Sequence, residues 1–403
     1  MNDKKLDVYY KDKLVGTLAE TATKLIAFQY SDEWINNGFS ISPFSLPLSS
    51  EVYIPKDTAR ERFKGLFGVF ADSLPDAWGE LLLDRYLSNH GIGRGYLTTL
   101  DRLAYIGNSG MGALEYRPSK NPDYDINGID YDTIAKECEK ILSSKETGEL
   151  DILYNLGGSS GGTRPKILIR SEEHECIVKF PSKNDAPNSG KMEYDYYICA
   201  KKCGIKMTKC ELLPSSYCDG YFKTERFDRV GSEKIFSITI AGLLEADFRA
   251  PSCDYNAYMK LVKILTREDE EQLEQMFRIM CFNVFTHNKD DHTKNFSFLY
   301  NNSKWELAPA YDMTYSTTYF GEHTTSINGK GKNILDNDMI SVGVTAGMSK
   351  NTCKQIIEEI RDKTAYLVSI YSDTISNSLG NERVGYQKEL KDIMQKRPGK
   401  NDL

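Results

Sequence analysis

Hydrophobic and polar residues alternate along residues 6–30 in the manner of β-strands. Two apolar runs, at 8–10 and 14–18, flank a polar turn at 11–13, and a third run follows at 25–28. Alternation with a period of two around polar turns is typical of half-buried strands. The pattern predicts a small antiparallel sheet.

Helical periodicity dominates other parts of the chain. Residues 72–76 supply a capping aspartate and an early proline, and apolar residues then recur at helical spacing until a stop near Gly91. The same spacing predicts helices over residues 131–142, 192–203, 261–265, 273–285, 356–371 and 386–394. Glycine- and proline-rich segments predict a loop at 105–114 and a linker at 117–122.

Strand patterns return in the middle of the chain. Residues 167–170 and 176–180 predict a hairpin directly after the glycine- and serine-rich loop at 156–166. Residues 296–300 alternate as a further strand before a turn at 301–303. From about residue 238 onward the pattern is mainly helical. The chain therefore combines strand-rich and helix-rich regions, which predicts the α+β class.

Composition and charge indicate the number of domains and the classes of binding partner that are excluded. A chain of 403 residues is long enough for two or three domains, and the net charge of −7 argues against direct, charge-driven binding of nucleic acid. The charged N-terminus lacks an apolar signal-peptide core and no apolar run is long enough to span a bilayer, so we expect a cytoplasmic protein without a membrane partner. The nine cysteines lack paired C-x-x-C spacing, which predicts reduced, mostly buried thiols.

Five residues carry the candidate chemistry. Asp290 and Asn295 have the spacing of the catalytic Asp and the metal-binding Asn in the protein-kinase signature, and Asp312 follows where a second metal ligand is needed. Upstream, Lys179 ends an apolar strand after the glycine loop, and Glu193 on the next predicted helix is expected to pair with it. The order of these residues predicts a phosphotransferase.

Phosphoryl transfer needs held phosphates, neutralised charge and an aligned acceptor hydroxyl. Lys179 is expected to bind ATP phosphates, Asn295 and Asp312 to hold Mg²⁺, and Asp290 to accept the proton of the hydroxyl. Free backbone amides in the glycine loop suit phosphate oxygens, although the loop alone fits a flexible connection as well and matches neither the kinase loop nor Walker A. The nucleotide-binding residues expected there are Gly157, Gly158, Ser159, Ser160, Gly161, Gly162 and Lys166.

The same region admits a second interpretation. His287, Asp290, Asp291 and His292 are residue types that bind transition metals, so a metal-dependent phosphohydrolase is an alternative. It leaves the glycine loop, the strand lysine and Asn295 without a role, and we therefore favour the kinase. Under the kinase interpretation, His287 is expected to cap the preceding helix and His292 to hydrogen-bond the loop backbone.

Four segments, residues 225–229, 241–244, 288–297 and 308–312, resemble the HipA family. Its members are serine/threonine kinases that serve as toxins of bacterial type II toxin–antitoxin modules. The resemblance extends over nearly the whole chain, because residues 6–115, including the segment 70–76, resemble the N-terminal domain of that family.

The resemblance implies use of ATP and Mg²⁺, phosphorylation of a protein serine, commonly on an aminoacyl-tRNA synthetase, and growth arrest. It also implies a helix-turn-helix antitoxin that holds the toxin on operator DNA. Position in the motifs makes Asp290 the catalytic Asp, Asn295 and Asp312 the metal ligands, and Lys179 the phosphate-binding Lys. It likewise places the adenine hinge at Glu225 and Phe227, and a motif histidine of open role at His292.

Two positions depart from the family pattern. The loop carries Ser159 and Ser160 inside it, whereas the founding toxin of the family is autophosphorylated on a serine just before its loop. We expect Ser159 or Ser160 to be the inhibitory autophosphorylation site, because a phosphate there would occupy the space and field meant for ATP. Asp291 stands where some relatives carry glycine, so the choice of Asp290 as base rests on spacing.

We therefore predict an α+β, protein-kinase-like two-lobed fold, with a β-rich lobe, an all-helical C-terminal lobe and a small N-terminal α+β domain. The domain boundaries are predicted at residues 1–116, 129–228 and 229–403, with ATP between the last two. A catalytically silent kinase-like module that binds an antitoxin is the second alternative. The presence of Asp290, Asn295, Asp312 and Lys179 together argues against it.

Overall fold

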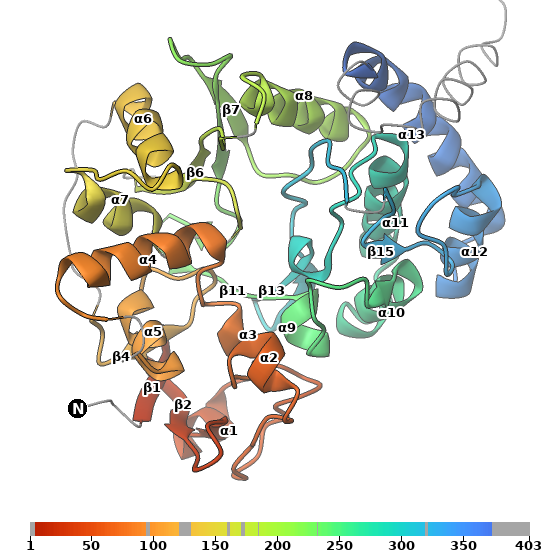
Figure 1. The fold of residues 1–403 in the computed structure, drawn as a ribbon. Helices are drawn as coiled ribbons and strands as arrows, with labels where there is room; N and C mark the ends of the chain where they lie inside the picture. Colours follow the sequence, from red (N-terminus) through yellow and green to blue (C-terminus); the bar gives the residue numbers. More distant parts are fainter. Residues whose placement is uncertain are drawn as a thin grey trace, which may run out of the picture. The chain divides into compact units, whose positions relative to one another are not determined.

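The computed structural model describes residues 5–93, 97–120, 130–158, 162–170, 174–183, 185–231, 233–318 and 321–372. The chain divides into two compact units, whose elements are labelled in Figure 1. The first unit comprises Met1–Tyr194, Thr208–Ala250 and Thr293–Pro309. The second unit comprises Asp195–Met207, Pro251–His292 and Ala310–Leu403.

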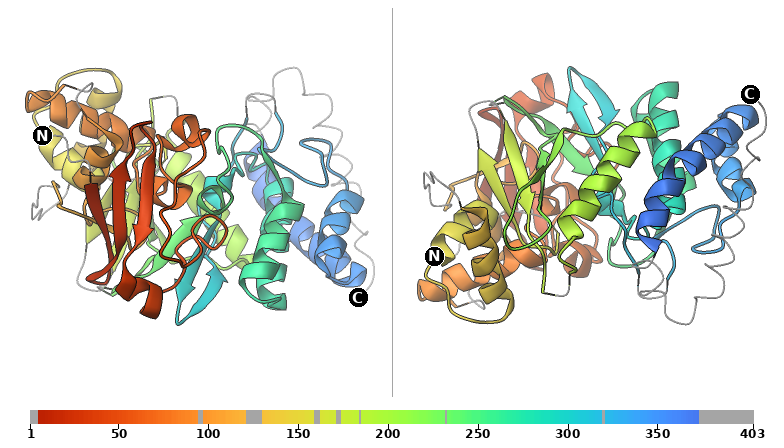
Figure 2. Two further views of the ribbon diagram at one scale, coloured as in Figure 1. Left: turned by 90° about the horizontal axis from the view of Figure 1, so that it is seen from below. Right: turned by 90° about the horizontal axis from the view of Figure 1, so that it is seen from above.

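The first unit begins with an antiparallel sheet of strand order β3-β2-β1-β4, whose first three strands are drawn in red in Figure 2. Its strands are β1 (Lys5–Tyr10), β2 (Lys13–Glu20), β3 (Ile26–Tyr30) and β4 (Glu115–Arg117). Lys11 and Asp12 have φ angles of 47° and 59°, as a tight two-residue hairpin turn requires. The predicted sheet is confirmed. The linker prediction is wrong at its first residue, because Arg117 pairs with Asp7 of β1.

Five of the seven helices listed here for the first unit, α1, α2, α3, α5 and α7, were not predicted from the sequence pattern. The helix predicted after residues 72–76 is α4, and the one at 131–142 is α6; both are confirmed. Residues 99–106 form α5 because Thr98 and Asp101 make a reciprocal capping box. The helices are α1 (Asp32–Asn37), α2 (Ala59–Phe63), α3 (Gly68–Ala71), α4 (Ala77–Asn89), α5 (Thr99–Ile106), α6 (Tyr131–Leu142) and α7 (Leu150–Gly157).

Helix α7 shortens the predicted glycine loop. Leu156 and Gly157 belong to α7, where Leu156 is buried, and Gly158 caps its end. Helix α7 packs against α4, and the two share a buried core with Trp78 and Leu153. Figure 1 shows α4 and α7 side by side. The loop expected from residue 156 therefore starts later, after α7. The glycine-rich composition of the segment gave no sign of this helix.

A second antiparallel sheet, of order β5-β6-β8-β7, follows in the first unit. Its strands are β5 (Lys166–Arg170), β6 (Glu175–Lys179), β7 (Cys210–Leu213) and β8 (Tyr221–Glu225). The predicted hairpin is the β5–β6 pair and is confirmed. Helix α8 (Ser189–Lys202) starts in this unit and ends in the second, and it confirms the helix predicted at 192–203.

Short elements complete the first unit. The sheet β11-β13-β14 carries β13, which confirms the strand predicted at 296–300. Its residues Ser297, Phe298 and Leu299 are all buried. The elements are β9 (Arg229–Val230), β10 (Glu233–Lys234), β11 (Phe236–Thr239), α9 (Ile240–Leu244), a 3₁₀ turn η2 (Thr293–Asn295), β13 (Ser297–Asn301) and β14 (Lys304–Leu307).

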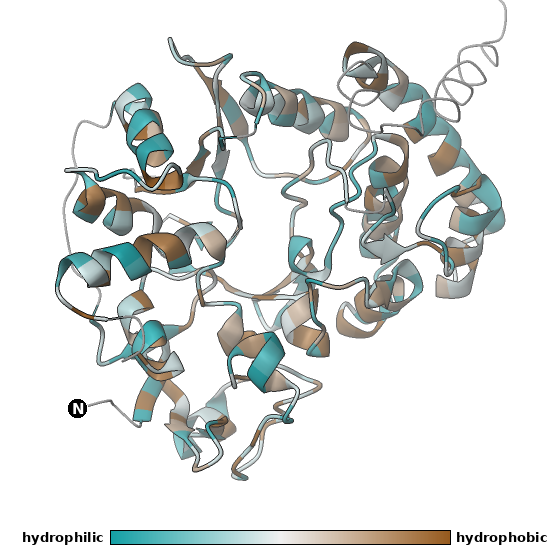
Figure 3. Ribbon diagram, viewed as in Figure 1, coloured by the Kyte–Doolittle hydropathy of each residue, from teal (hydrophilic) through white to brown (hydrophobic). Residues whose placement is uncertain are grey.

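The second unit is mainly helical. Asp269 caps the start of α11 by accepting from Glu271 N and Gln272 N, at 3.0 and 3.3 Å. Leu273, Phe277 and Cys281 recur at helical spacing on one face of α11 and are buried, so this face is core packing. Figure 3 shows brown, hydrophobic segments along α11. The elements are β12 (Cys253–Asp254), α10 (Tyr255–Leu265), α11 (Glu270–Phe285), β15 (Thr325–Ser326), α12 (Asp336–Ala346) and α13 (Lys350–Ile370).

Three remaining predictions concern thiols, membranes and the C-terminus. All nine cysteines are free, and all but Cys218 and Cys253 are buried, as expected. Across the described residues, no helix is both long and apolar enough for a bilayer span. The helix predicted at 356–371 is confirmed by α13, which ends one residue earlier, at Ile370, whereas the one predicted at 386–394 lies outside the described residues.

Candidate active site

A buried ion pair joins the strand lysine to the helix glutamate of the first unit. Lys179 Nζ, at the end of β6, lies 2.5 Å from Glu193 Oε1, and the two side chains are 12% and 3% exposed. Arg164 Nη1 lies 3.8 Å from the second oxygen of Glu193. Buried charges persist when they are paired. The predicted Lys179–Glu193 pair is therefore confirmed, and it holds the Lys179 ammonium group in a defined position.

The structure includes both ends of the glycine-rich segment predicted at residues 156–166. Gly157 and Gly158 close α7, while Gly162 precedes β5 with a left-handed φ of 85°. A Cβ on Gly162 would lie 2.5 Å from Lys166 Nζ, the movable end of a flexible side chain, so it is the left-handed conformation that favours glycine there. Lys166 is buried at the start of β5. The predicted Ser159, Ser160 and Gly161 lie outside the described residues.

Asp76 makes contacts that sequence patterns did not reveal. Its Oδ2 accepts from Gly162 N at 3.0 Å, and its Oδ1 accepts from Lys294 Nζ at 2.6 Å. Burial alone would raise the pKa of Asp76, but Lys294 and the Gly162 N–H more than offset that effect, so the pKa lies below its usual value. Lys294 belongs to η2, directly before the predicted metal ligand Asn295. One carboxylate thus joins the glycine segment to the η2 turn.

The predicted adenine hinge leaves the second sheet at β8. Glu225 ends this strand and pairs with Cys176 of β6, and its N–H donates to Lys209 O at 2.9 Å. Phe227, two residues later, is half-buried. Arg226 N donates to Glu175 O at 2.9 Å, so the backbone on both sides of the hinge is held by neighbouring segments.

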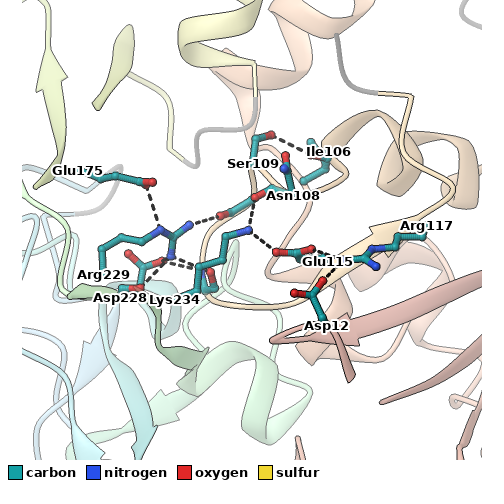
Figure 4. A network of polar contacts seen from close by, with 12 residues as sticks. Asp12, Ile106, Asn108, Ser109, Glu115, Arg117, Glu175, Asp228, Arg229 and Lys234 are labelled. Carbon is teal, nitrogen blue, oxygen red and sulfur yellow. Dashed lines mark hydrogen bonds and ion pairs between the residues drawn. The ribbon is translucent and has the colours of Figure 1, made fainter. Parts of the chain in front are cut away.

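Asp228 anchors a buried charge cluster directly after the hinge. Its carboxylate accepts from Arg226 Nε at 2.9 Å, from Arg226 Nη2 at 2.8 Å and from Gly112 N at 2.6 Å. Arg229 Nη1 lies 3.0 Å from Asp228 Oδ2, and Arg229 Nε lies 3.0 Å from Glu175 Oε2 (Figure 4). Burial raises the pKa of Asp228, but the two guanidinium groups outweigh it and hold the pKa below its usual range.

In the second unit, α11 ends in a backbone cap at His287. This residue has a left-handed φ of 55°, and the following Asn288 N donates to Asn283 O at 3.0 Å. That pairing is the Schellman arrangement of a helix end, so the predicted capping role of His287 is confirmed. Burial, with repulsion from Lys289 and His323, lowers the pKa of His287 to about 3. The imidazole is therefore neutral near pH 7.

Asp290 and Asp291 have opposite environments. The Asp290 side chain is 57% exposed. The Asp291 carboxylate is fully buried and accepts from Tyr255 Oη at 3.0 Å, from His323 Nδ1 at 2.9 Å and from Thr325 N at 3.1 Å. These donors engage both oxygens of Asp291. Asp290 is therefore the solvent-accessible carboxylate of the two, and its assignment as the base stays a prediction.

The backbone of the loop is held by the same buried network. Asn283 Nδ2 donates to Tyr255 Oη at 3.0 Å, and Asn288 Nδ2 donates to Asn283 Oδ1 at 2.9 Å. Ser316 Oγ donates to Asn288 Oδ1 at 2.9 Å and accepts from Asp290 N at 3.0 Å. A satisfied polar network of this kind rigidifies the segment that carries it. Asp290 is thus exposed on a fixed backbone.

The remaining predicted residues are His292 and Asp312. His292 Nε2 lies 3.8 Å from Asp290 Oδ1. Asp312 has a left-handed φ of 53°, a conformation uncommon outside glycine that concentrates at functional sites. Asp312 is half-buried.

No group of three or more His, Cys, Asp or Glu side chains that could hold a metal is found within the described ranges. The transition-metal alternative also meets a specific obstacle, since Asp291 is engaged by three donors. Of the two predicted magnesium ligands, Asn295 belongs to the first unit and Asp312 to the second. An amide oxygen and a carboxylate are the hard donors that Mg²⁺ takes.

Comparisons with known proteins agree with the resemblance. The HipA N-terminal domain matches residues 6–117, and the HipA-like C-terminal domain matches residues 158–367. A relative from Haemophilus influenzae with the name "Putative kinase" is 25% identical over 296 residues, which cover 62% of this chain and 86% of the relative. "Putative kinase Y4mE" from Sinorhizobium fredii is 21% identical over 415 residues, covering 94% of this chain and 95% of the relative.

Among solved structures, the chain is similar to one in the complex of Shewanella oneidensis MR-1 HipA, HipB and operator DNA. The TM-score is 0.68 at 18% identity, over 90% of each chain. This similarity confirms the predicted α+β fold.

Proposed function

Because the chain belongs to the HipA family, we propose that it is an ATP-dependent protein serine/threonine kinase. The observation that carries the proposal is the buried Lys179–Glu193 pair. In protein kinases such a pair holds the lysine that binds the nucleotide phosphates. The names of the two relatives support kinase activity as well.

The proposed mechanism gives each predicted residue one task. Lys179 binds the α- and β-phosphates, and the backbone around Glu225 and Phe227 receives the adenine. Asn295 and Asp312 supply oxygen ligands for Mg²⁺, which when bound neutralises charge on the transferred group. The exposed carboxylate of Asp290 orients the acceptor hydroxyl and accepts its proton.

We further propose that the kinase is the toxin of a toxin–antitoxin module. Its substrate is a translation-related protein such as an aminoacyl-tRNA synthetase, and it phosphorylates itself at Ser159 or Ser160. The similarity to HipA from a complex with HipB and operator DNA supports a helix-turn-helix antitoxin partner. The net charge of −7 favours DNA contact through that partner.

Phosphate transfer from labelled ATP tests the activity. Purified protein is incubated with γ-labelled ATP, Mg²⁺ and a panel of aminoacyl-tRNA synthetases, beside an Asp290→Asn variant. We expect label on the protein itself and on one synthetase, and none with the variant. Equal labelling by Asp290→Asn contradicts the mechanism. Absence of all labelling favours the catalytically silent binding module.

Two further measurements test the regulatory parts of the proposal. Phosphopeptide mapping of active enzyme given ATP is expected to find phosphate on Ser159 or Ser160, and two unmodified serines contradict that assignment. Induction in a bacterial host is expected to stop growth, and co-expression of the proposed helix-turn-helix antitoxin is expected to restore growth. Normal growth under induction alone contradicts the toxin role.

A further inference from the structure

Asp76 has no task in the proposed mechanism, yet it contacts two segments that do. It lies in the part of the chain that matches the HipA N-terminal domain. Its partners Gly162 and Lys294 are 86 and 218 residues away along the chain. All three belong to the first unit. The Asp76 side chain is 23% exposed and that of Lys294 is 14% exposed, so the ion pair is largely shielded from water.

The contact with the glycine segment is two-sided. Gly162 N donates to Asp76 Oδ2 at 3.0 Å, while Gly162 O accepts from Trp78 N at 3.3 Å. Trp78 Nε1 also donates to Lys166 O at 3.2 Å. The start of α4 therefore holds the backbone of the glycine segment directly before β5. Few conformations of Gly162 satisfy both contacts, so its wide conformational freedom is removed.

The contact with η2 is also reinforced. Lys294 Nζ lies between the Asp76 carboxylate, at 2.6 Å, and the Phe248 ring, whose centroid is 4.3 Å away. Asp72, four residues earlier in the chain, accepts from Thr239 N and Oγ1, both at 2.8 Å. Ile240 N then donates to Phe296 O at 2.8 Å, directly after Asn295.

Two carboxylates of residues 72–76 thus fix the surroundings of η2. Asp72 acts through Thr239, and Asp76 acts on Lys294 directly. Neither carboxylate caps α4 in the way that the sequence predicted, since Asp76 makes no side-chain cap hydrogen bond. The carboxylate of Asp76 is instead committed to two segments that the kinase proposal places at the phosphates and at the metal.

We infer that Asp76 is a positioning residue for phosphoryl transfer. Its carboxylate fixes the glycine segment, expected to bind phosphate, at Gly162, and it fixes η2, which carries the predicted metal ligand Asn295, at Lys294. This inference rests on the proposed kinase function. It gives the N-terminal domain a direct part in the phosphate site. Asparagine at position 76 keeps the shape of aspartate but removes the charge that balances Lys294. Its amide offers one oxygen to two donors, so one of the two contacts is lost.

The test compares Asp76→Asn, Lys294→Met and the double variant with wild type. The matched control is Asp84→Asn, because Asp84 also lies on α4 and pairs with Arg102 at 3.1 Å, with both side chains 15% exposed. The measurements are kcat and KM for ATP, thermal unfolding, and hydrogen exchange in peptides containing Gly162 or Lys294. Hydrogen exchange reports local order even in a protein without activity.

We expect Asp76→Asn to lower kcat/KM for ATP about ten- to a hundredfold, because small displacements of positioning groups have effects of that size. Exchange is expected to rise in both peptides, while Asp84→Asn changes neither. The double variant is expected to be no worse than Lys294→Met, since residues that act together are not additive.

Wild-type kinetics and unchanged exchange in Asp76→Asn overturn the inference. So does a rise in exchange across the whole chain, which would make Asp76 a residue needed only for folding. If wild type itself neither binds ATP nor transfers phosphate, the kinase proposal fails, and with it the role in phosphoryl transfer. The exchange data then decide separately whether Asp76 fixes the two segments.

Discussion

Replacing Asp228 by asparagine removes the central charge of the buried cluster. In the folded protein, Asp228 and Glu175 face Arg226 and Arg229, with the Asp228 side chain fully buried and the two arginine side chains 1% and 3% exposed. Asparagine leaves two buried guanidinium groups against one carboxylate. Breaking a buried pair by removal of one partner costs about 3–5 kcal/mol. That is a large part of the roughly 5–15 kcal/mol by which folded proteins are stable.

Urea denaturation at pH 7, followed by circular dichroism, measures this loss. Asp228→Asn is expected to lower the denaturation midpoint, with the free energy of unfolding reduced by about 3–5 kcal/mol. The control is Asp12→Asn. Asp12 pairs with Arg117 at 2.6 Å, but the side chains are 87% and 43% exposed (Figure 4). A surface pair contributes at most about 1 kcal/mol, so the control is expected to unfold close to wild type.

A double variant separates charge balance from lost shape. Asp228→Asn with Arg226→Met removes one charge of each sign and leaves Arg229 opposite Glu175. It is expected to be less destabilised than the sum of the two single variants, because neighbouring charges couple. A loss below about 1 kcal/mol in Asp228→Asn, or strict additivity in the double variant, refutes the reasoning from buried charge.

Three other predictions follow from the site. Lys179→Met is expected to raise the Kd for ATP at least about tenfold by calorimetry, since it removes a charge-assisted contact with phosphate; an unchanged Kd contradicts its role. His287 has a folded pKa of about 3 against an ordinary 6.5, so the unfolded chain binds the proton first and stability falls as the pH drops below 6.5. His287→Asn is expected to lose about 2 kcal/mol less between pH 6.5 and 5, and identical pH profiles contradict this. Asp291→Asn is expected to destabilise by about 2 kcal/mol or more, whereas the exposed Asp290→Asn changes stability by less than about 0.5 kcal/mol in urea titrations; the reverse order contradicts the assigned environments.

Local patterns in the sequence predicted the Lys179–Glu193 pair. Lys179 ends a strand with alternating apolar and polar residues, and Glu193 lies in the first half of a helix with helical periodicity. The secondary structure around each residue can therefore be predicted from its own neighbours in the sequence. The same local patterns gave a wrong prediction for the start of the glycine-rich segment. Gly157 and Gly158 looked like a loop, but they end α7, whose apolar face packs against α4. Only tertiary packing decides between a loop and a helix end in such a segment.

Contacts between distant residues were beyond the reach of sequence patterns. Asp76 looked like a helix cap, because nothing near it reveals Lys294 at a distance of 218 residues. The neighbours Asp290 and Asp291 are chemically identical in the sequence. Their different roles depend on burial and on three donors, among them Tyr255 and His323, supplied from elsewhere in the chain.

The initial rate of phosphate transfer from γ-labelled ATP, measured for wild type and Asp290→Asn in the presence of Mg²⁺, tests the central claim most directly. Loss of a general base lowers a rate roughly a hundred- to ten-thousandfold. We predict a fall of that size in Asp290→Asn with its fold intact. A rate for Asp290→Asn within twofold of an active wild type would contradict the claim that this carboxylate activates the acceptor hydroxyl.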